Sequence, residues 1–270
     1  MKSEGDETKG SMRTVRLDVT SQESVQKAVV FTEMHLSGGL QLWALVNNAG
    51  FFALNGPDDW CSLEDYDQSL KVNTLGHIRV VHAFRHLLER SKGRIVTVTS
   101  ATTRLPLAGA CAYTVAQSAI EAYTNALRHE VRPFGITCHI IELGVFRTDF
   151  IDSASLKARL NTSWEKLTHK KKAKYGEEFK DDYIASVDAD IQKRASSCLN
   201  CAVNTYYHSI TARNPRLRYR CGFDAHFANF ISYLPSPLAA ILNAKNAKTP
   251  GKPSVLATTS NEKNSDKKEQ

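Results

Sequence analysis

The sequence predicts an α/β fold in which a parallel sheet is covered by helices. From Met12 onward, short apolar runs alternate with segments whose apolar residues recur every three or four positions. This is the pattern of strands alternating with helices. The run Ile136–Ile141 is apolar at nearly every position, which is typical of a strand buried on both faces. With 270 residues, 42% apolar and 23% charged, the chain has ordinary globular composition.

The N-terminal part predicts one strand, one helix and a second strand. Arg13–Asp18 is the first predicted strand. The run Thr20-Ser21-Gln22-Glu23 is typical of a capping box, in which the Thr20 hydroxyl accepts from the backbone N–H of Glu23. We expect the helix that it opens to end at Gly38-Gly39, and the second strand to cover Leu42–Val46.

The middle of the chain predicts two long helices and two further strands. Ser62, followed by acidic residues in the first turn, starts a helix over residues 62–88. Arg94–Thr99 is the third predicted strand. Cys111–Val131 is a helix lined with small residues, and Ile136–Ile141 is the fourth strand.

The C-terminal part predicts a helical region and a tail. Residues 150–212 are mostly helical and polar, and a short strand over Arg216–Arg220 follows. After residue 243 the composition is too polar to bury enough surface for folding. We therefore expect a disordered lead over residues 1–11, a domain over residues 12–243 and a disordered basic tail over residues 244–270.

The charge and the cysteine content limit the class of protein. The net charge is +7, but no aromatic ladder or helix-turn-helix pattern accompanies the basic clusters. We interpret them as a solvated surface and a solubilising tail, which excludes a nucleic-acid partner and leaves contact with an anionic membrane surface as the alternative. Six cysteines are too few for a disulfide scaffold, so a reducing compartment fits.

The chain is expected to be soluble and intracellular. No run reaches the roughly 18–20 apolar residues that a spanning helix requires, and the first ten residues are polar and acidic, unlike a signal peptide. The predicted location is the cytoplasm, or the surface of the endoplasmic reticulum or of the mitochondrial membrane. The aromatic-rich stretch over residues 222–235 is interpreted as a wall of the substrate site, with contact to a membrane as the alternative.

Four polar features occur in a fixed order on the predicted elements. Asn47-Asn48-Ala49-Gly50 follows a strand, and Asn73 lies inside a helix. Ser100 ends a strand, and Tyr113 follows Ser100 by thirteen residues at the start of a helix. Each feature alone is common in turns and caps, but together they are specific.

This combination resembles the short-chain dehydrogenase/reductase family, over about residues 12–243. Further motifs resemble the branch of retinol dehydrogenases, 17-beta-hydroxysteroid dehydrogenase type 2 and D-beta-hydroxybutyrate dehydrogenase. These motifs are Leu17-Asp18-Val19-Thr20, Tyr175-Gly176-Glu177-Glu178-Phe179 and Gly222-Phe223-Asp224. The resemblance implies a Rossmann-like, doubly wound parallel sheet with a helical substrate-binding region over residues 150–212.

The resemblance also implies catalytic roles. Tyr113 would exchange the proton of the substrate oxygen, although a free phenol has a pKa of about 10 and is scarcely ionised at neutral pH. Ser100 would donate a hydrogen bond to the same oxygen, where negative charge develops. Asn73 would hold, through its main chain, a water that connects the proton path to solvent.

The same resemblance implies a bound NAD or NADP. Asp18 would accept a hydrogen bond from the adenine amine. The Asn47–Gly50 turn would place its backbone against the cofactor, with Asn47 and Ala49 in the turn and Gly50 permitting close approach. Thr148 would bond the carboxamide, and no metal ion is implied.

One departure from the family lies in the catalytic motif. The family has Tyr-x-x-x-Lys, whereas this chain has Tyr113-Thr114-Val115-Ala116-Gln117. Gln117 stands on the same helix face as Tyr113, so its amide would still donate to the nicotinamide ribose. The positive charge that favours the phenolate is lost, which corresponds to about 1–3 pKa units.

A second departure concerns the cofactor site. No glycine-rich phosphate-binding turn precedes Asp18, so the first βαβ segment of the family is expected to be missing, and with it the residue that selects NAD or NADP. Leu143 also replaces a proline of the family before Gly144, which predicts a less rigid turn around Thr148.

The sequence therefore predicts an oxidoreductase that interconverts an alcohol and a carbonyl with NAD or NADP, impaired by both departures. A steroid, a retinoid or a 3-hydroxy acid is the expected apolar substrate. The alternative is a non-catalytic truncated isoform or pseudoenzyme that dimerises with a full-length relative. Helices 62–88 and 111–131 would form the homo- or heterodimer interface.

The sequence also contains Cys198-Leu199-Asn200-Cys201. The spacing is that of a metal or redox pair, but no second pair and no histidine cluster accompany it. We interpret it as a structural pair of helix cysteines, with a zinc or redox site as the alternative.

Overall fold

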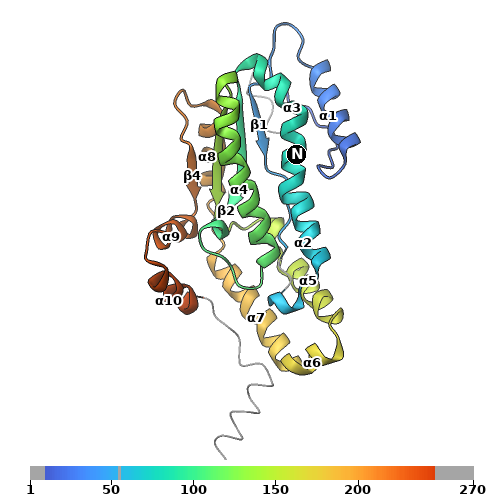
Figure 1. Cartoon of the computed structure of the whole chain (residues 1–270), viewed down its shortest axis with the longest axis vertical. Helices are drawn as coiled ribbons and strands as arrows, with labels where there is room; N and C mark the ends of the chain where they lie inside the picture. The colour runs from blue at the N-terminus through green and yellow to red at the C-terminus, as the bar shows by residue number, and fades with distance from the viewer. Residues whose placement is uncertain (1–9, 54–55, 247–270) are drawn as a thin grey trace, which may run out of the picture.

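A computed structural model of the chain describes residues 10–53 and 56–246. Within these residues a four-stranded sheet lies at the centre of the molecule, and all neighbouring strands are parallel (Figure 1). Because the strands are parallel, their carboxyl ends meet at one edge of the sheet. The strands follow one another across the sheet in chain order: β1 (Ala44–Asn47), β2 (Arg94–Ser100), β3 (Thr137–Leu143) and β4 (Arg218–Cys221).

Helices connect the strands and cover both faces of the sheet. The described helices are α1 (Gln22–Met34), α2 (Leu63–Leu70), α3 (His77–Ser91), α4 (Cys111–Val131), α5 (Ser153–Glu165), α6 (His169–Tyr175), α7 (Glu177–Arg194), α8 (Leu199–Thr211), α9 (Phe223–Ile231) and α10 (Ser236–Asn246). A π-helical segment, Lys71–Gly76, joins α2 to α3.

Two apolar layers hold the helices to the sheet. Helices α3 and α4 pack on one face through a buried cluster that includes Leu88, Ile95 and Leu127. Helix α8 packs on the other face, where Ile210 contacts the cluster of Val96, Ile141 and Tyr219. Helix α1 lies outside α3 in Figure 1. Helices on both faces of a parallel sheet confirm the predicted doubly wound α/β fold.

The predicted strand Arg13–Asp18 is wrong. These residues have an irregular, exposed backbone. Among the described residues no strand lies beside them, so their N–H and C=O groups have no ladder partner, and apolar alternation alone does not make a strand. Helix α1 also starts differently from the prediction, because Ser21, and not Thr20, accepts from a backbone N–H, that of Ser24.

Several predicted elements are confirmed closely. Helix α4 has the predicted bounds, Cys111–Val131. The predicted helix over residues 62–88 is the continuous run from α2 through the π-helical segment to α3. Ser62 caps it in a capping box with Asp65, and Lys92 ends it in the left-handed conformation.

The predicted tail begins too early. Helix α10 continues to Asn246, so residues 244–246 are helical and not disordered. The reason is that residues 236–246 contain no glycine, and their single proline, Pro237, stands in the first turn, where proline is tolerated. Residues 1–9 of the predicted lead and residues 247–270 of the tail lie outside the described residues.

Arg94 joins the start of β2 to the end of α8. Its guanidinium donates to the carbonyl oxygens of Ser209 (3.0 Å), Ile210 (2.8 Å) and Ala212 (2.5 Å), which a helix end leaves without intrahelical partners. The side chain is buried, and the Trp43 ring lies 4.9 Å from its charged carbon.

We expect Arg94→Ala to lower the free energy of unfolding by about 2–4 kcal/mol, because charge-assisted hydrogen bonds are lost and the carbonyls of Ser209 and Ala212 lose their donor, whereas that of Ile210 still accepts from Trp43 Nε1. Urea unfolding followed by circular dichroism measures this change. The control is Arg90→Ala, an exposed arginine on α3, which is expected to change stability by less than about 0.5 kcal/mol. Equal stability of both variants would contradict the role given to Arg94.

Candidate active site

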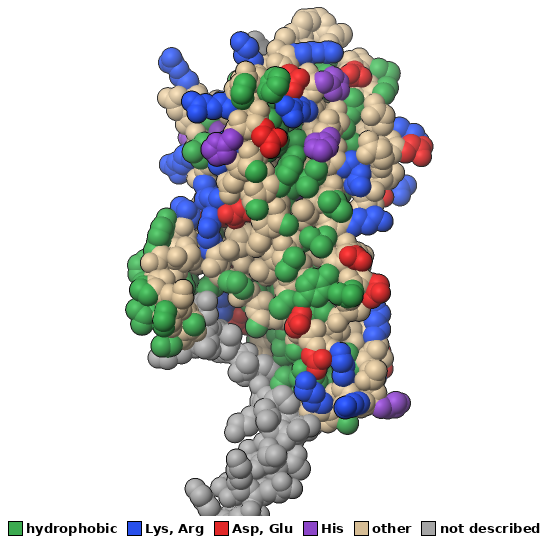
Figure 2. All heavy atoms as spheres, viewed as in Figure 1, with side chains coloured by type: hydrophobic (Ala, Val, Ile, Leu, Met, Phe, Trp, Pro, Cys, Tyr) green, Lys and Arg blue, Asp and Glu red, His purple; other side chains and the backbone are tan. Residues whose placement is uncertain are grey.

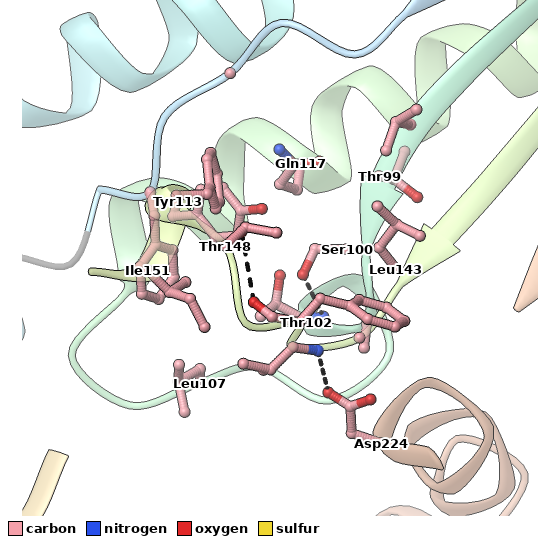
Figure 3. A pocket seen from close by; sticks show the side chains of 18 of the residues that line it. Thr99, Ser100, Thr102, Leu107, Tyr113, Gln117, Leu143, Thr148, Ile151 and Asp224 are labelled. Atoms are coloured by element: carbon pink, nitrogen blue, oxygen red, sulfur yellow. Dashed lines mark hydrogen bonds between the residues drawn. The ribbon is translucent and has the colours of Figure 1, made fainter. Parts of the chain in front are cut away.

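A cavity of about 490 Å³ lies at the edge of the sheet where the strands end. Ligands in open parallel sheets bind at this edge. Its walls come from the loop after β1, the end of β2, the first turns of α4, the loop after β3, and helices α7, α8 and α9. Figure 3 shows labelled side chains from β2 and the loop after it, α4, the loop after β3 and α9 around one space. The predicted site residues among the lining are Ala49, Gly50, Ser100, Tyr113, Gln117 and Thr148.

Tyr113 is buried against the cavity wall. It stands in the first turn of α4, and the Phe52 ring contacts its ring edge-on at 5.0 Å between centroids. Burial raises the pKa of Tyr113 to about 12, whereas a hydrogen bond with the Ser100 side chain acts to lower it. At neutral pH the phenol therefore keeps its proton.

Ser100 reaches Tyr113 because β2 ends where α4 begins. Ser100 is the last residue of β2 and caps the short 3-10 helix Ala101–Thr103, and its hydroxyl accepts from the backbone N–H of Thr102 at 3.2 Å. The Ser100 side chain also acts to lower the pKa of Tyr113, and both residues line the cavity. The two hydroxyls that the sequence predicts to be catalytic therefore lie together at the cavity.

Gln117 lies one helical turn after Tyr113 on α4 (Figure 3). Its side chain is buried and lines the cavity. The amide oxygen of Gln117 has no hydrogen-bond partner in the described part of the chain. A buried polar atom without a partner is costly, so this oxygen is available to a ligand in the cavity.

The side chain of Asn73 supports the site from behind and does not line the cavity. It is fully buried in the π-helical segment. Its Oδ1 accepts from the backbone N–H of Phe51 at 3.0 Å, and its Nδ2 donates to the Phe51 carbonyl at 3.1 Å. A Cβ on Gly50 would lie 2.9 Å from this Oδ1, so the loop after β1 can approach Asn73 only with glycine there.

The Asn47–Gly50 turn is divided between the fold and the cavity. The Asn47 side chain donates to the carbonyl of His77 at 3.2 Å and does not line the cavity. The Ala49 carbonyl lies 2.6 Å from His77 Nε2, so this nitrogen carries the proton. Burial lowers the pKa of His77 and keeps the ring neutral. His77 thus fixes the position of Ala49 and Gly50 at the cavity.

The two other predicted cofactor residues differ in position. Asp18 is exposed before α1 and does not line the cavity, and hydrogen bonds from the Thr20 side chain and backbone lower the pKa of its carboxyl. Thr148 lines the cavity. Its hydroxyl donates to the Phe146 carbonyl at 3.5 Å. Because this hydrogen bond is long and weak, the hydroxyl can donate to a ligand in the cavity instead.

Asp224 is a site residue that the sequence reasoning did not assign. Its carboxylate accepts from the backbone N–H of Val145 at 2.6 Å, in the loop that carries Thr148 (Figure 3). A Cβ on Gly144 would lie 1.7 Å from the same carboxylate, so Gly144 is required there. Partial burial raises the pKa of Asp224. The signal was present in Gly222-Phe223-Asp224, which served only to define the family branch.

A buried ion cluster lies behind the site and was also missed. Glu142 on β3 and Glu121 on α4 share Arg104 and Arg218, and Glu142 also pairs with Arg220. Arg104 bonds both carboxylates, at 2.7 Å to Glu121 and 3.0 Å to Glu142. The sequence features that indicate it are Glu142 near the end of an apolar strand, and Arg218 and Arg220 two residues apart on another strand.

The lining fits the nicotinamide end of a dinucleotide. The unpartnered Gln117 oxygen, the close approach at Gly50 and the Thr148 hydroxyl offer hydrogen bonds around one space. For the diphosphate the fit is not complete, since the glycines among the described lining residues are Gly50 and Gly144 and not a glycine-rich turn. Gln117, Gly50 and Thr148 are therefore the residues that would hold the nicotinamide ribose and carboxamide.

The cysteine pair of the sequence is a disulfide in the structure. Cys198 and Cys201 form a disulfide at the start of α8. The described residues contain no group of three or more His, Cys, Asp or Glu arranged to bind a metal ion. No helix in the described ranges combines the length and apolarity needed to cross a membrane.

Comparison with known proteins identifies the family of the chain. The short chain dehydrogenase family profile matches residues 1–158. The chain is 42% identical over 220 residues to "3beta-hydroxysteroid dehydrogenase dhs-16" of Caenorhabditis elegans, covering 81% of this chain and 57% of that protein. It is 37% identical over 236 residues to "Retinol dehydrogenase 5" of Homo sapiens, covering 84% of this chain and 71% of the relative.

Solved structures agree on the fold. A short-chain dehydrogenase from Streptomyces avermitilis superposes with a TM-score of 0.61 at 19% identity, covering 84% of this chain and 75% of that one. NAD+-bound xylitol dehydrogenase superposes with a TM-score of 0.60 at 20% identity, covering 78% of each chain. The chain belongs to the short-chain dehydrogenase/reductase family, in the branch of the retinol and 17-beta-hydroxysteroid dehydrogenases.

Proposed function

We propose that this chain interconverts an alcohol and a carbonyl on an apolar substrate, with NAD or NADP as the redox partner. The observation that carries the proposal is that Ser100 and Tyr113 line the same largely apolar cavity, with the Ser100 side chain near enough to lower the pKa of Tyr113. A phenol and an alcohol beside each other supply what the oxygen of a reacting carbinol needs, a proton partner and a hydrogen-bond donor.

The protein's part in the reaction is to hold and protonate the substrate oxygen. Ser100 donates a hydrogen bond to that oxygen, which stabilises the negative charge that develops there. Tyr113 donates its proton in the reductive direction and accepts it in the oxidative direction. The nicotinamide, when bound, supplies or accepts the hydride. Gln117, Gly50 and Thr148 hold that end of the cofactor.

The direction of the reaction follows from the environment of Tyr113. Burial raises the pKa of Tyr113 to about 12, so near neutral pH the side chain is a proton donor and not an acceptor. Gln117 carries no charge that would oppose the effect of burial. We therefore infer that the chain favours carbonyl reduction near neutral pH and that alcohol oxidation becomes faster as the pH rises.

The cavity favours a large apolar substrate. Its walls include Phe52, Leu105, Leu107, Phe150 and Ile151, and its volume lies within the usual range for drug-sized ligands. Among the expected substrates, a steroid or a retinoid matches these apolar walls better than a small 3-hydroxy acid. The carboxylate of such an acid would have to compete with Asp190 for Arg194, which lines the cavity and is paired with Asp190 at 2.8 Å. The names of the relatives, a 3beta-hydroxysteroid dehydrogenase and a retinol dehydrogenase, support the same class.

The second candidate function is that of a non-catalytic partner. Gln117, in place of the lysine of the family, favours it, because no cation then promotes the phenolate of Tyr113. Such a chain would act by pairing with a full-length relative through helices 62–88 and 111–131, in a homo- or heterodimer. Absence of turnover in every assay below, with NAD(H) and with NADP(H), would favour this alternative.

We also infer that the surface of α9 and α10 contacts a membrane. Figure 2 shows hydrophobic side chains gathered over these helices. Because the opposite side of α9 lines the cavity through Asp224 and Ala228, an apolar substrate could pass from the bilayer to the site. The exposed residues are Phe223 (86%), Phe230 (63%), Tyr233 (76%), Leu238 (52%) and Ile241 (53%).

Tyr113→Phe is expected to reduce turnover by about 100- to 10,000-fold, because the ring stays in place and only the proton partner is lost. Reduction of a steroid ketone and of all-trans-retinal, with NADH and with NADPH, measures the effect. Ser100→Ala is expected to have an effect of the same order, with circular dichroism confirming that both variants fold. Turnover by Tyr113→Phe equal to that of the unaltered chain would contradict the proposal.

Gln117→Lys is expected to lower the pKa of Tyr113, because the ammonium group favours the phenolate. In the unaltered chain, kcat/KM for alcohol oxidation should increase up to pH 10, since the phenol titrates at about 12. In the variant the same curve should move to lower pH by about 1–3 units. Gln117→Met, which is neutral and similar in size, is the control and should keep the original profile; an unchanged profile in Gln117→Lys would contradict the inference.

The double variant Phe223→Ser, Phe230→Ser is expected to bind membranes at least about tenfold more weakly, because each buried phenylalanine contributes roughly 1.5–3 kcal/mol. Flotation with vesicles of phosphatidylcholine and phosphatidylserine (4:1) measures the bound fraction. Leu63→Ser, at a residue on α2 that is 78% exposed, is the control and should bind like the unaltered chain. No binding of the unaltered chain to these vesicles would overturn the membrane contact.

A further inference from the structure

The disulfide between Cys198 and Cys201 lies on the surface, at the first turn of α8. Cys198 is the N-cap residue of this 13-residue helix, and Cys201 is in its first turn. Both cysteines are exposed. The other four cysteines differ, because Cys138 and Cys221 are buried and Cys61 and Cys111 are half-buried. Soluble thiols therefore reach Cys198 and Cys201 more easily than the other four cysteines.

The position at a helix N-terminus affects the chemistry of the pair. The dipole of a helix stabilises a thiolate at its N-terminus. A sulfur that leaves as a stabilised thiolate leaves faster, so a Cys-x-x-Cys pair in this position exchanges readily with thiols. The two-residue spacing keeps the second sulfur near the first, which allows the bond to form again.

The helical turn that holds the pair contributes to the cavity wall, although the two cysteines themselves do not line it. Leu199, between the two cysteines, and Ala202, directly after them, line the cavity, as does Tyr206 one turn later. The backbone N–H of Cys198 donates to the Ser196 hydroxyl at 3.2 Å, which joins this turn to the segment before it. A change at the disulfide therefore acts directly on residues that face the ligand.

Ser196 carries the connection to the loop of Thr148. Its backbone N–H donates to the Val145 carbonyl at 2.9 Å, and its carbonyl accepts from the N–H of Arg147 at 3.0 Å. Ser196 and Phe146 form an isolated parallel bridge. The segment before Cys198 thus holds the loop that would contact the nicotinamide carboxamide.

We propose that Cys198 and Cys201 form a thiol–disulfide exchange site that fixes the α8 wall of the cavity when oxidised and releases it when reduced. This proposal rests on the proposed function at one point only, which is that a ligand enters the cavity. The co-reactant is a low-molecular-weight thiol of the glutathione class, or a dithiol.

The exchange is balanced in two steps. A thiolate of the co-reactant attacks the sulfur of Cys201, the bond between the two cysteine sulfurs breaks, and Cys198 leaves as a thiolate. A second thiolate attacks the co-reactant's sulfur in this mixed disulfide, and Cys201 leaves. The protein disulfide gains two electrons, two molecules of thiol are oxidised to one disulfide, and their two protons pass to the two cysteines.

The first arm of the experiment measures the exchange itself. The full chain is incubated with glutathione and glutathione disulfide at increasing ratios, quenched with acid and alkylated, and its peptides are weighed by mass spectrometry. We expect Cys198 and Cys201 to become labelled together while the folded chain keeps Cys138 and Cys221 unlabelled. A pair that stays oxidised in the folded chain under 10 mM dithiothreitol would overturn the proposal.

The second arm measures the effect on the wall without any ligand or turnover. Hydrogen exchange of the peptides that cover residues 143–151 and 195–206 is compared between oxidised and reduced protein. We expect exchange to become at least threefold faster on reduction. Cys198→Ser, Cys201→Ser should match the reduced protein whether or not reductant is present.

The matched control is Ser197→Ala, Asn200→Ala, which alters two exposed residues of the same turn and keeps both cysteines. It should be protected like the oxidised protein and respond to reductant in the same way. Equal exchange in oxidised and reduced protein would overturn the coupling to the wall. An inactive enzyme that still shows the threefold change would contradict the proposed function and leave the exchange site standing.

Discussion

The geometry of the site depends on a carboxylate buried at the end of a central strand. Glu142 is 1% exposed, a position in which an unpaired charge would be strongly destabilising. It is stable because Arg104, Arg218 and Arg220 converge on it and because Arg104 and Arg218 also bind Glu121. One cluster therefore joins β3, β4, α4 and the loop after β2. Because two carboxylates and three guanidinium groups contact one another in this cluster, the elements that it joins are held in register.

This ion cluster explains how Ser100 at the end of a strand and Tyr113 at the start of a helix come to lie in one site. Arg104 belongs to the loop that follows Ser100, and Glu121 stands two turns after Tyr113 on the same helix. Holding Arg104 against Glu121 therefore holds the end of β2 against the start of α4, where the two hydroxyls meet. The arginines do not replace the missing cation near Tyr113, because each is already paired with a carboxylate and only burial and Ser100 govern the pKa of Tyr113.

The parts of the fold that depend on local pattern could be predicted from the sequence, and the parts that depend on distant partners could not. Cys111–Val131 was predicted with its bounds because apolar and small residues recur at helical spacing throughout it. Arg13–Asp18 has strand-like residues, yet a strand exists only where another pairs with it. The family motif likewise indicated Ser100 and Tyr113 together, whereas the contact of Asp224 with Val145 joins residues 79 positions apart, a pairing that the local pattern around Asp224 does not indicate.

The same distinction corrects the expectation drawn from Leu143. Loss of a proline before Gly144 suggests a mobile turn around Thr148, because proline restricts the backbone of its neighbours. In the fold the turn is held from two sides instead, by the Asp224 carboxylate on the N–H of Val145 and by Ser196 on the backbone of Val145 and Arg147. Gly144 makes this possible, since any side chain there would occupy the position of the carboxylate. The contacts that position the loop thus come from segments that follow it by about fifty and eighty residues. A loop whose own sequence predicts a less rigid turn is therefore positioned by the segments that begin α8 and α9.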